Sequence, residues 1–166
     1  MPLIRDGRLV DDTFRTIAED APLPENGTIV SFARFQRHRA SLVARNVPLG
    51  VLLQSHESPE PLGDDVHRLS VVALEFPRFR DGRAFSWARI LRGRMDYAGE
   101  IRAVGHYLYD QIAFMHRVGF DSFEVPEHFS LAQYLRALGE MSQVYQPSTD
   151  RRVTIRDLRA RLSPAA

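Results

Sequence analysis

Two short apolar runs stand out in the middle of the sequence: Leu49-Gly50-Val51-Leu52-Leu53 and Leu69-Ser70-Val71-Val72-Ala73-Leu74. Continuous apolar runs of this length are typical of strands that are covered on both faces in a parallel sheet. Ile101-Arg102-Ala103-Val104 and Ser122-Phe123-Glu124-Val125 follow as a third and a fourth strand. The four segments therefore predict the centre of a mainly parallel sheet.

Helical patterns precede, separate and follow these strands. We expect helices from Phe32 to Arg45, from a cap at Ser86, from Leu108 to Gly119, and from a capping box formed by Ser130 and Gln133. The expected core face of the last helix consists of Leu131, Tyr134, Leu135, Leu138, Met141 and Tyr145. Alternation of strand and helix predicts right-handed crossovers in one α/β domain with about four parallel strands, each followed by a helix. The sheet could be an open sheet or half of a barrel, and the exposed edges of a half-barrel would favour a homodimer.

The two ends of the chain are expected to be peripheral. Residues 3–10 contain an Asp-Gly turn between two apolar pairs, which predicts a small hairpin inside an N-terminal segment of residues 1–27. Residues 28–145 form the predicted α/β core. Residues 146–166 form a C-terminal segment that we expect to end in a short helix capped by Thr154.

Composition narrows the chemistry that these 166 residues can perform. All 22 basic residues are arginine, and there is no lysine and no cysteine. Thiolate chemistry, Cys-ligated metal centres and lysine Schiff bases are therefore excluded within this chain. The net charge of +1 gives no indication of nucleic-acid binding. No apolar run approaches the about 20 residues needed to cross a bilayer, so we expect a cytoplasmic protein that does not bind membranes.

The segment after the second apolar run is the richest in functional side chains. Residues 75–86 contain three arginines, two acids, three phenylalanines and the predicted start of a helix. Guanidinium groups and free helix N–H groups suit an oxyanion such as phosphate, sulfate or sulfite. The candidate binding residues are Asp81, Arg83, Ser86, Arg89 and Arg92, with Arg89 and Arg92 expected on one stripe of the helix. The plainer alternative is an Asp-Gly turn, a routine helix cap and aromatic side chains that hold the loop to the core.

A second group of candidates surrounds the third strand. Arg102, a further candidate binding residue for the oxyanion, lies in this strand, while His106 and Asp110 follow it four residues apart. On a helix that spacing would place the two side chains on one face, where they could act as an acid and base pair. The alternative, which we favour from the residues alone, is a solvated pair on the surface. The scattered histidines show no metal-binding spacing, so no metal site is expected.

These two blocks resemble a bacterial family called domain of unknown function 934. The resemblance rests on residues 75–92, on Gly99-Glu100-Ile101-Arg102-Ala103-Val104-Gly105, on Asp110-Gln111 and on residues 119–124, and extends from about Leu49 to about Leu138. Members of the family are usually labelled as probable oxidoreductases involved in sulfite reduction. The resemblance implies that the Asp81-Gly82-Arg83 loop and the pair Arg89 and Arg92 belong to one site or interface. A cysteine common in the family before Gly-Phe-Asp is Val118 here, which argues against a shared thiol redox mechanism.

Two functions are open at this point. The protein could be an accessory protein or oxidoreductase of assimilatory sulfite or sulfate reduction, with an Arg-rich loop that binds the oxyanion and an unidentified cofactor. It could instead be a non-catalytic partner that docks on sulfite reductase or a related sulfate-reduction enzyme through exposed Arg and Phe side chains. Sequence alone does not separate the two.

Overall fold

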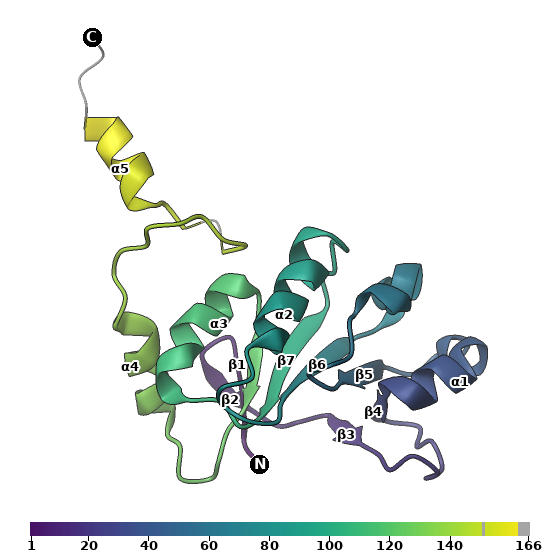
Figure 1. Cartoon of the computed structure of the whole chain (residues 1–166). Helices are drawn as coiled ribbons and strands as arrows, with labels where there is room; N and C mark the ends of the chain where they lie inside the picture. Colours follow the sequence, from purple (N-terminus) through teal and green to yellow (C-terminus); the bar gives the residue numbers. More distant parts are fainter. Residues whose placement is uncertain (151, 163–166) are drawn as a thin grey trace.

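A curled open sheet, resembling half of a barrel, forms the framework of the protein (Figure 1). The computed structural model describes residues 1–150 and 152–162. Within them the sheet has eight strands in the order β2-β1-β8-β7-β6-β5-β4-β3. The parallel strands are β3 (Phe14–Thr16), β4 (Gly27–Ser31), β5 (Leu49–Leu53), β6 (Val71–Phe76), β7 (Glu100–Gly105) and β8 (Ser122–Glu124). The antiparallel hairpin of β1 (Leu3–Arg5) and β2 (Arg8–Val10) extends the sheet beyond β8.

One face of the sheet carries the helices. The α-helices are α1 (Phe32–Val43), α2 (Arg83–Gly93), α3 (Ile112–Val118), α4 (Leu131–Gly139) and α5 (Ile155–Leu162), and the 3₁₀ helices are η1 (Glu60–Arg68) and η2 (Tyr109–Gln111). Strands β4 to β8 are consecutive neighbours in the sheet, and α1, α2 and α3, which connect strands of this series, lie on the same side as α4, which follows β8 (Figure 1). The terminal helix α5 lies away from the sheet at the end of the segment that follows α4. No helix in the described part of the chain is long and apolar enough to cross a membrane.

The core lies between this face and the helices. Alternate residues of the central strands, such as Val51, Val72, Leu74 and Ile101, are fully buried beneath α1, α2 and α3. Burying each such side chain contributes about 1.5–3 kcal/mol. The opposite face, which we call the helix-free face because none of α1–α5 packs on it, has a smaller cluster around Ile29 and Val71.

The N-terminal segment supplies the strands at both edges of the sheet. After the hairpin beside β8, the chain crosses the helix-free face and pairs β3 with β4 at the other edge (Figure 1). Asp12 lies in this crossing and accepts a 2.8 Å hydrogen bond from the Arg102 guanidinium on β7. The crossing therefore gives a buried arginine on the helix-free face one of its counter-charges.

Most local predictions are confirmed. The Asp6-Gly7 turn has two positive φ angles, Gly119 ends α3 in the left-handed conformation, and Ser130 forms the expected capping box with Gln133. Thr154 caps α5 as expected, while Arg151 and residues 163–166 lie outside the described residues. The sheet is larger than expected, because β3 and β4 add two parallel strands.

Two helix predictions were wrong. Ser86 does not cap α2, which begins at Arg83 because the Asp81 side chain already accepts the Arg83 N–H at the Asp-Gly turn. Helix α4 ends at Gly139, a residue that disfavours the helix interior by about 1 kcal/mol. Met141 and Tyr145 consequently lie outside the helix and are exposed, as is Leu135 within it.

Candidate functional site

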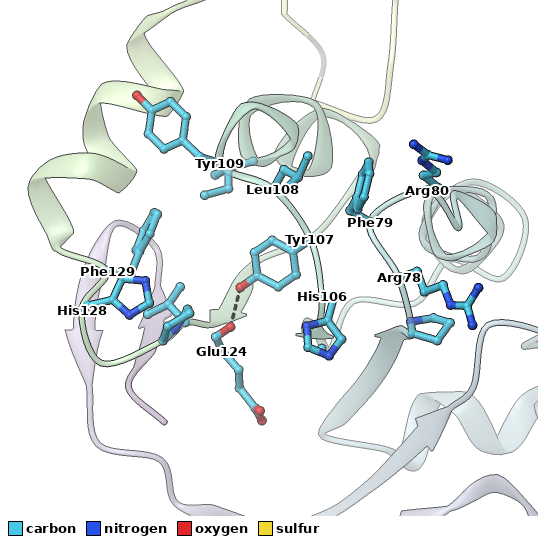
Figure 2. A pocket seen from close by; sticks show the side chains of 15 residues that line it. Arg78, Phe79, Arg80, His106, Tyr107, Leu108, Tyr109, Glu124, His128 and Phe129 are labelled. Carbon is cyan, nitrogen blue, oxygen red and sulfur yellow. Dashed lines mark hydrogen bonds between the residues drawn. The ribbon is translucent and has the colours of Figure 1, made fainter.

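A pocket of about 710 Å³ opens at the carboxyl ends of β6, β7 and β8 (Figure 2). Its walls come from the three segments that follow these strands, residues 77–80, 105–109 and 124–129, together with Ile112. Ligands of parallel α/β proteins gather at this end of the strands, because the connecting loops converge there. The segment of residues 75–86, which the sequence indicated as the richest in functional side chains, supplies one wall of this pocket.

Backbone geometry holds two of these segments together. Gly105 has a φ of +91°, and a Cβ atom there would lie 2.5 Å from the Phe76 carbonyl oxygen, so only glycine fits. The next residue, His106, donates its N–H to that oxygen at 2.7 Å. Gln111 accepts the Leu108 N–H at 2.9 Å and donates its own amide to the Phe79 carbonyl oxygen at 3.1 Å. These hydrogen bonds therefore hold the segments after β6 and β7 in fixed positions relative to each other.

Tyr107 forms the central wall of the pocket. Its ring packs edge-on against Phe76 and Phe123, and its hydroxyl donates a 2.6 Å hydrogen bond to the Glu124 carbonyl oxygen. Burial is the main cause that raises the pKa of Tyr107 well above its usual range, so the phenol stays protonated. Figure 2 shows the Glu124 carboxylate pointing away from Tyr107. It approaches Arg102 at 3.8 Å, and burial raises its pKa.

Basic side chains line the pocket without counter-ions. Arg78, His106 and His128 are exposed, and none of them has an ion-pair or hydrogen-bond partner for its side chain in the described part of the chain. Arg80 lies over the Phe79 ring, 5.3 Å from its centroid. In Figure 2 Arg78 and His106 lie on one side of Tyr107, and His128 lies with Phe129 on the other side. We call Arg78, His106 and His128 the pocket cations, because each is a basic side chain that can carry a positive charge.

Most of the predicted anion ligands lie outside this pocket, and their side chains already form hydrogen bonds or ion pairs within the protein. Arg83 donates to both carboxylate oxygens of Asp81, at 2.9 and 2.6 Å, and to the Ser55 hydroxyl at 2.9 Å. The Arg83 hydrogen bond lowers the pKa of Asp81 far below its usual range. The Asp81-Gly82-Arg83 sequence therefore builds the start of α2 and ties it to the segment after β5.

Arg92 and Arg102 use their guanidinium groups inside the fold. Arg92 donates to the carbonyl oxygens of Gly99 (2.8 Å), Gly119 (3.1 Å) and Tyr97, and pairs with Asp121. Arg102 is 1% exposed and pairs with Asp12 and Glu100 at 2.8 and 2.9 Å. We call these two side chains the interior arginines. Their role as anion ligands stays a prediction.

The remaining predicted residues are Ser86 and Arg89 on α2, and His106 and Asp110 after β7. Ser86 and Arg89 are exposed and line a second groove between α2 and residues 147–149, so Arg89 does not project together with the inward-turned Arg92. His106 and Asp110 do not share a helix face, because Gly105 turns the chain and the first helical residue is Tyr109. Of the eight predicted site residues, His106 alone lines the large pocket.

Sequence reasoning missed several pocket residues. Arg78, Tyr107 and His128 were not among the candidate site residues, although each follows a predicted strand. Their position after a strand was the signal that could have found them. Among the described residues, no three His, Asp or Glu side chains are grouped as a metal site would require.

The fold and the pocket define a parallel α/β protein of the half-barrel type with a ligand-sized pocket at the carboxyl ends of its strands. The chain belongs to DUF934, a family of bacterial proteins of unknown function, whose sequence profile matches residues 50–156. The match runs from β5 into α5 and includes every residue that lines the pocket, which confirms the family resemblance. No curated protein and no solved structure matches the chain significantly.

Proposed function

We propose that the protein binds a small anionic ligand in the pocket beyond β6, β7 and β8, as a cytoplasmic accessory protein of sulfite or sulfate reduction. The observation that carries the binding proposal is the set of pocket cations, Arg78, His106 and His128, which have no counter-ions among the described residues. The link to sulfite reduction rests on the label that members of this family usually carry, while the family itself is described as one of unknown function.

Charge decides which class of ligand fits the pocket best. Glu124 is the one acidic residue among those that line the pocket, and its carboxylate approaches Arg102 at 3.8 Å. A cation would therefore meet basic groups without compensation. An anion would gain charge-assisted hydrogen bonds from Arg78, whose planar guanidinium can bind two oxygens at once.

A binding role is better supported than covalent or redox chemistry by the side chains of this chain. The sequence has no thiol and no lysine amine, and the Tyr107 hydroxyl is held protonated in a hydrogen bond to a carbonyl oxygen. The rings of His106 and His128 line the pocket without a partner in the described structure, so each is available to contact a bound ligand.

Titration calorimetry with sulfite, sulfate and phosphate tests the proposal. Arg78→Ala should weaken binding of the preferred anion at least about tenfold, which corresponds to about 1.4 kcal/mol. Arg68→Ala is the matched control, because Arg68 is exposed and precedes β6, at the end of the strand opposite to Arg78. The proposal fails if none of these anions and none of the aromatic anions described below binds, or if both variants bind like the wild type.

A second candidate function, docking on sulfite reductase, is favoured by exposed apolar side chains. Phe79, Leu108 and Phe114 are each between 44% and 47% exposed, and the first two lie at the mouth of the pocket. Phe79→Ala and Arg89→Ala should weaken capture of the reductase in a pull-down, and capture that neither change weakens would contradict docking through these side chains. The possible homodimer stays a prediction that size-exclusion chromatography with light scattering would test.

A further inference from the structure

We propose that the ligand of the large pocket is an aromatic anion, with its ring against Tyr107 and its anionic group at Arg78 and His106. This inference rests on the proposed anion-binding function and names the chemical class that the same pocket accepts. It depends on the size of the pocket, on the chemistry of its walls and on the position of the pocket cations.

Size argues against an inorganic oxyanion as the whole ligand. The pocket has a volume of about 710 Å³. A water molecule occupies about 30 Å³ in the liquid, so an ion of four or five heavy atoms would fill only a small part of this space. Pockets of about 300–1,000 Å³ are typical of organic ligands.

The walls are mainly apolar and aromatic. Phe79, Tyr107, Tyr109 and Phe129 contribute rings from three separate segments, and prolines and aliphatic side chains fill the spaces between them. Phe79 and Leu108 are each 44% exposed at the mouth. A flat ring placed there would remove this surface from water and pack against aromatic side chains, which an inorganic ion cannot do.

The positions of the pocket cations determine the orientation of such a ligand in the pocket. Arg78 and His106 lie together on one side of Tyr107 in Figure 2, whereas Phe129 lies on the opposite side with His128. An anionic substituent at the first pair places the attached ring over the centre of the pocket. The guanidinium of Arg78 fits phosphate, sulfonate and carboxylate groups, so the structure specifies an aromatic anion and the experiment distinguishes the three.

A graded set of small ligands tests this inference by calorimetry or fluorescence. Affinity should rise from inorganic phosphate through phenyl phosphate to 1-naphthyl phosphate, by at least about tenfold overall. Comparison of 1-naphthyl phosphate, 1-naphthalenesulfonate and 1-naphthoate then identifies the preferred anionic group. Neutral 1-naphthol should bind more weakly than the preferred naphthyl anion.

Two variants measure separately what the ring and the anionic group of the ligand contribute to binding affinity. Phe79→Ala should weaken the naphthyl ligands, including 1-naphthol, and leave inorganic phosphate unchanged. Arg78→Ala should weaken every anion and leave 1-naphthol unchanged, while Arg68→Ala should change none of these affinities. Phe79 is suited to this test because it is partly exposed in a loop, so its truncation leaves the core intact.

The outcomes distinguish this inference from the function on which it rests. Inorganic phosphate or sulfite that binds as tightly as the naphthyl anions would overturn the aromatic class and leave anion binding intact. Naphthol that binds as tightly as the naphthyl anions, with Arg78→Ala without effect, would overturn anion binding itself. If neither the inorganic nor the aromatic anions bind, both proposals fail.

Discussion

The interior arginines and the pocket cations are basic side chains in opposite surroundings. Arg92 and Arg102 lie within the fold and pair with carboxylates, and Arg92 also donates to three carbonyl oxygens. Arg78, His106 and His128 lie in the mouth of a pocket and have no such partners in the described residues. The first set stabilises the fold, and the second remains available to a ligand.

The difference shows how a chain without lysine uses its arginines. A guanidinium carries five donors in a fixed plane, so one side chain can join segments that are distant in sequence. Arg92 joins α2 to the turns before β7 and β8, and Arg102 joins β7 to the N-terminal crossing. Abundance of arginine in a motif therefore does not by itself identify an anion site.

The strongest test of this comparison is the removal of an interior arginine. Arg102→Leu should lower the free energy of unfolding by about 3–5 kcal/mol, because Glu100, Asp12 and Glu124 would lose their buried counter-charge. Urea unfolding at pH 7 measures the change. Arg5→Leu is the control, because Arg5 contacts the same Glu100 from an exposed position and should cost less than about 1 kcal/mol. A stable Arg102→Leu variant that loses anion binding would instead place Arg102 in the binding site.

A partly buried histidine, His116, provides a test whose expected effect is of intermediate size. His116 hydrogen-bonds to Tyr134, and burial lowers the pKa of His116, so the folded protein holds it neutral. An unfolded histidine takes up a proton near pH 6.5, before the folded one does, so stability falls as pH falls through this range. One proton accounts for at most about 1.4 kcal/mol per pH unit.

Thermal unfolding between pH 7 and pH 5 measures this effect. His116→Gln should lose stability less steeply than the wild type as the pH falls, because its amide does not titrate. His67→Gln, at an exposed position, should keep the wild-type slope. Equal slopes in all three proteins would show that protonation of His116 does not limit stability in acid.

The smallest expected change in the free energy of unfolding is that for Arg78, one of the pocket cations. Arg78→Ala should change the free energy of unfolding by less than about 0.5 kcal/mol, because the side chain is exposed and has no partner in the described structure. Urea unfolding of this variant beside Arg102→Leu measures the contrast directly. A loss above about 2 kcal/mol would make Arg78 a structural residue and remove the main support for the anion proposal.

Much of the fold could be predicted from local patterns. The strand at Leu49–Leu53 has the predicted bounds, and the Asp6-Gly7 turn and the Ser130 capping box depend only on neighbouring residues. The short strand β3 was not predictable in this way, because three residues carry no periodicity and pair only after the chain has crossed the sheet. The predicted start of α2 was wrong because two residues that can cap a helix, Asp81 and Ser86, lie close together in the sequence, and the Asp81 side chain accepts the N–H at the observed start.

The sequence by itself determined the alternation of strands and helices and the absence of cysteine thiols and lysine amines from these 166 residues. Only the tertiary structure decided which basic side chains are free. The partners of Arg83, Arg92 and Arg102 include Ser55, Asp121 and Asp12, which lie 28, 29 and 90 residues away along the chain. Periodicity records which face of an element is buried, whereas the pairing of charges depends on where the completed fold brings distant segments together.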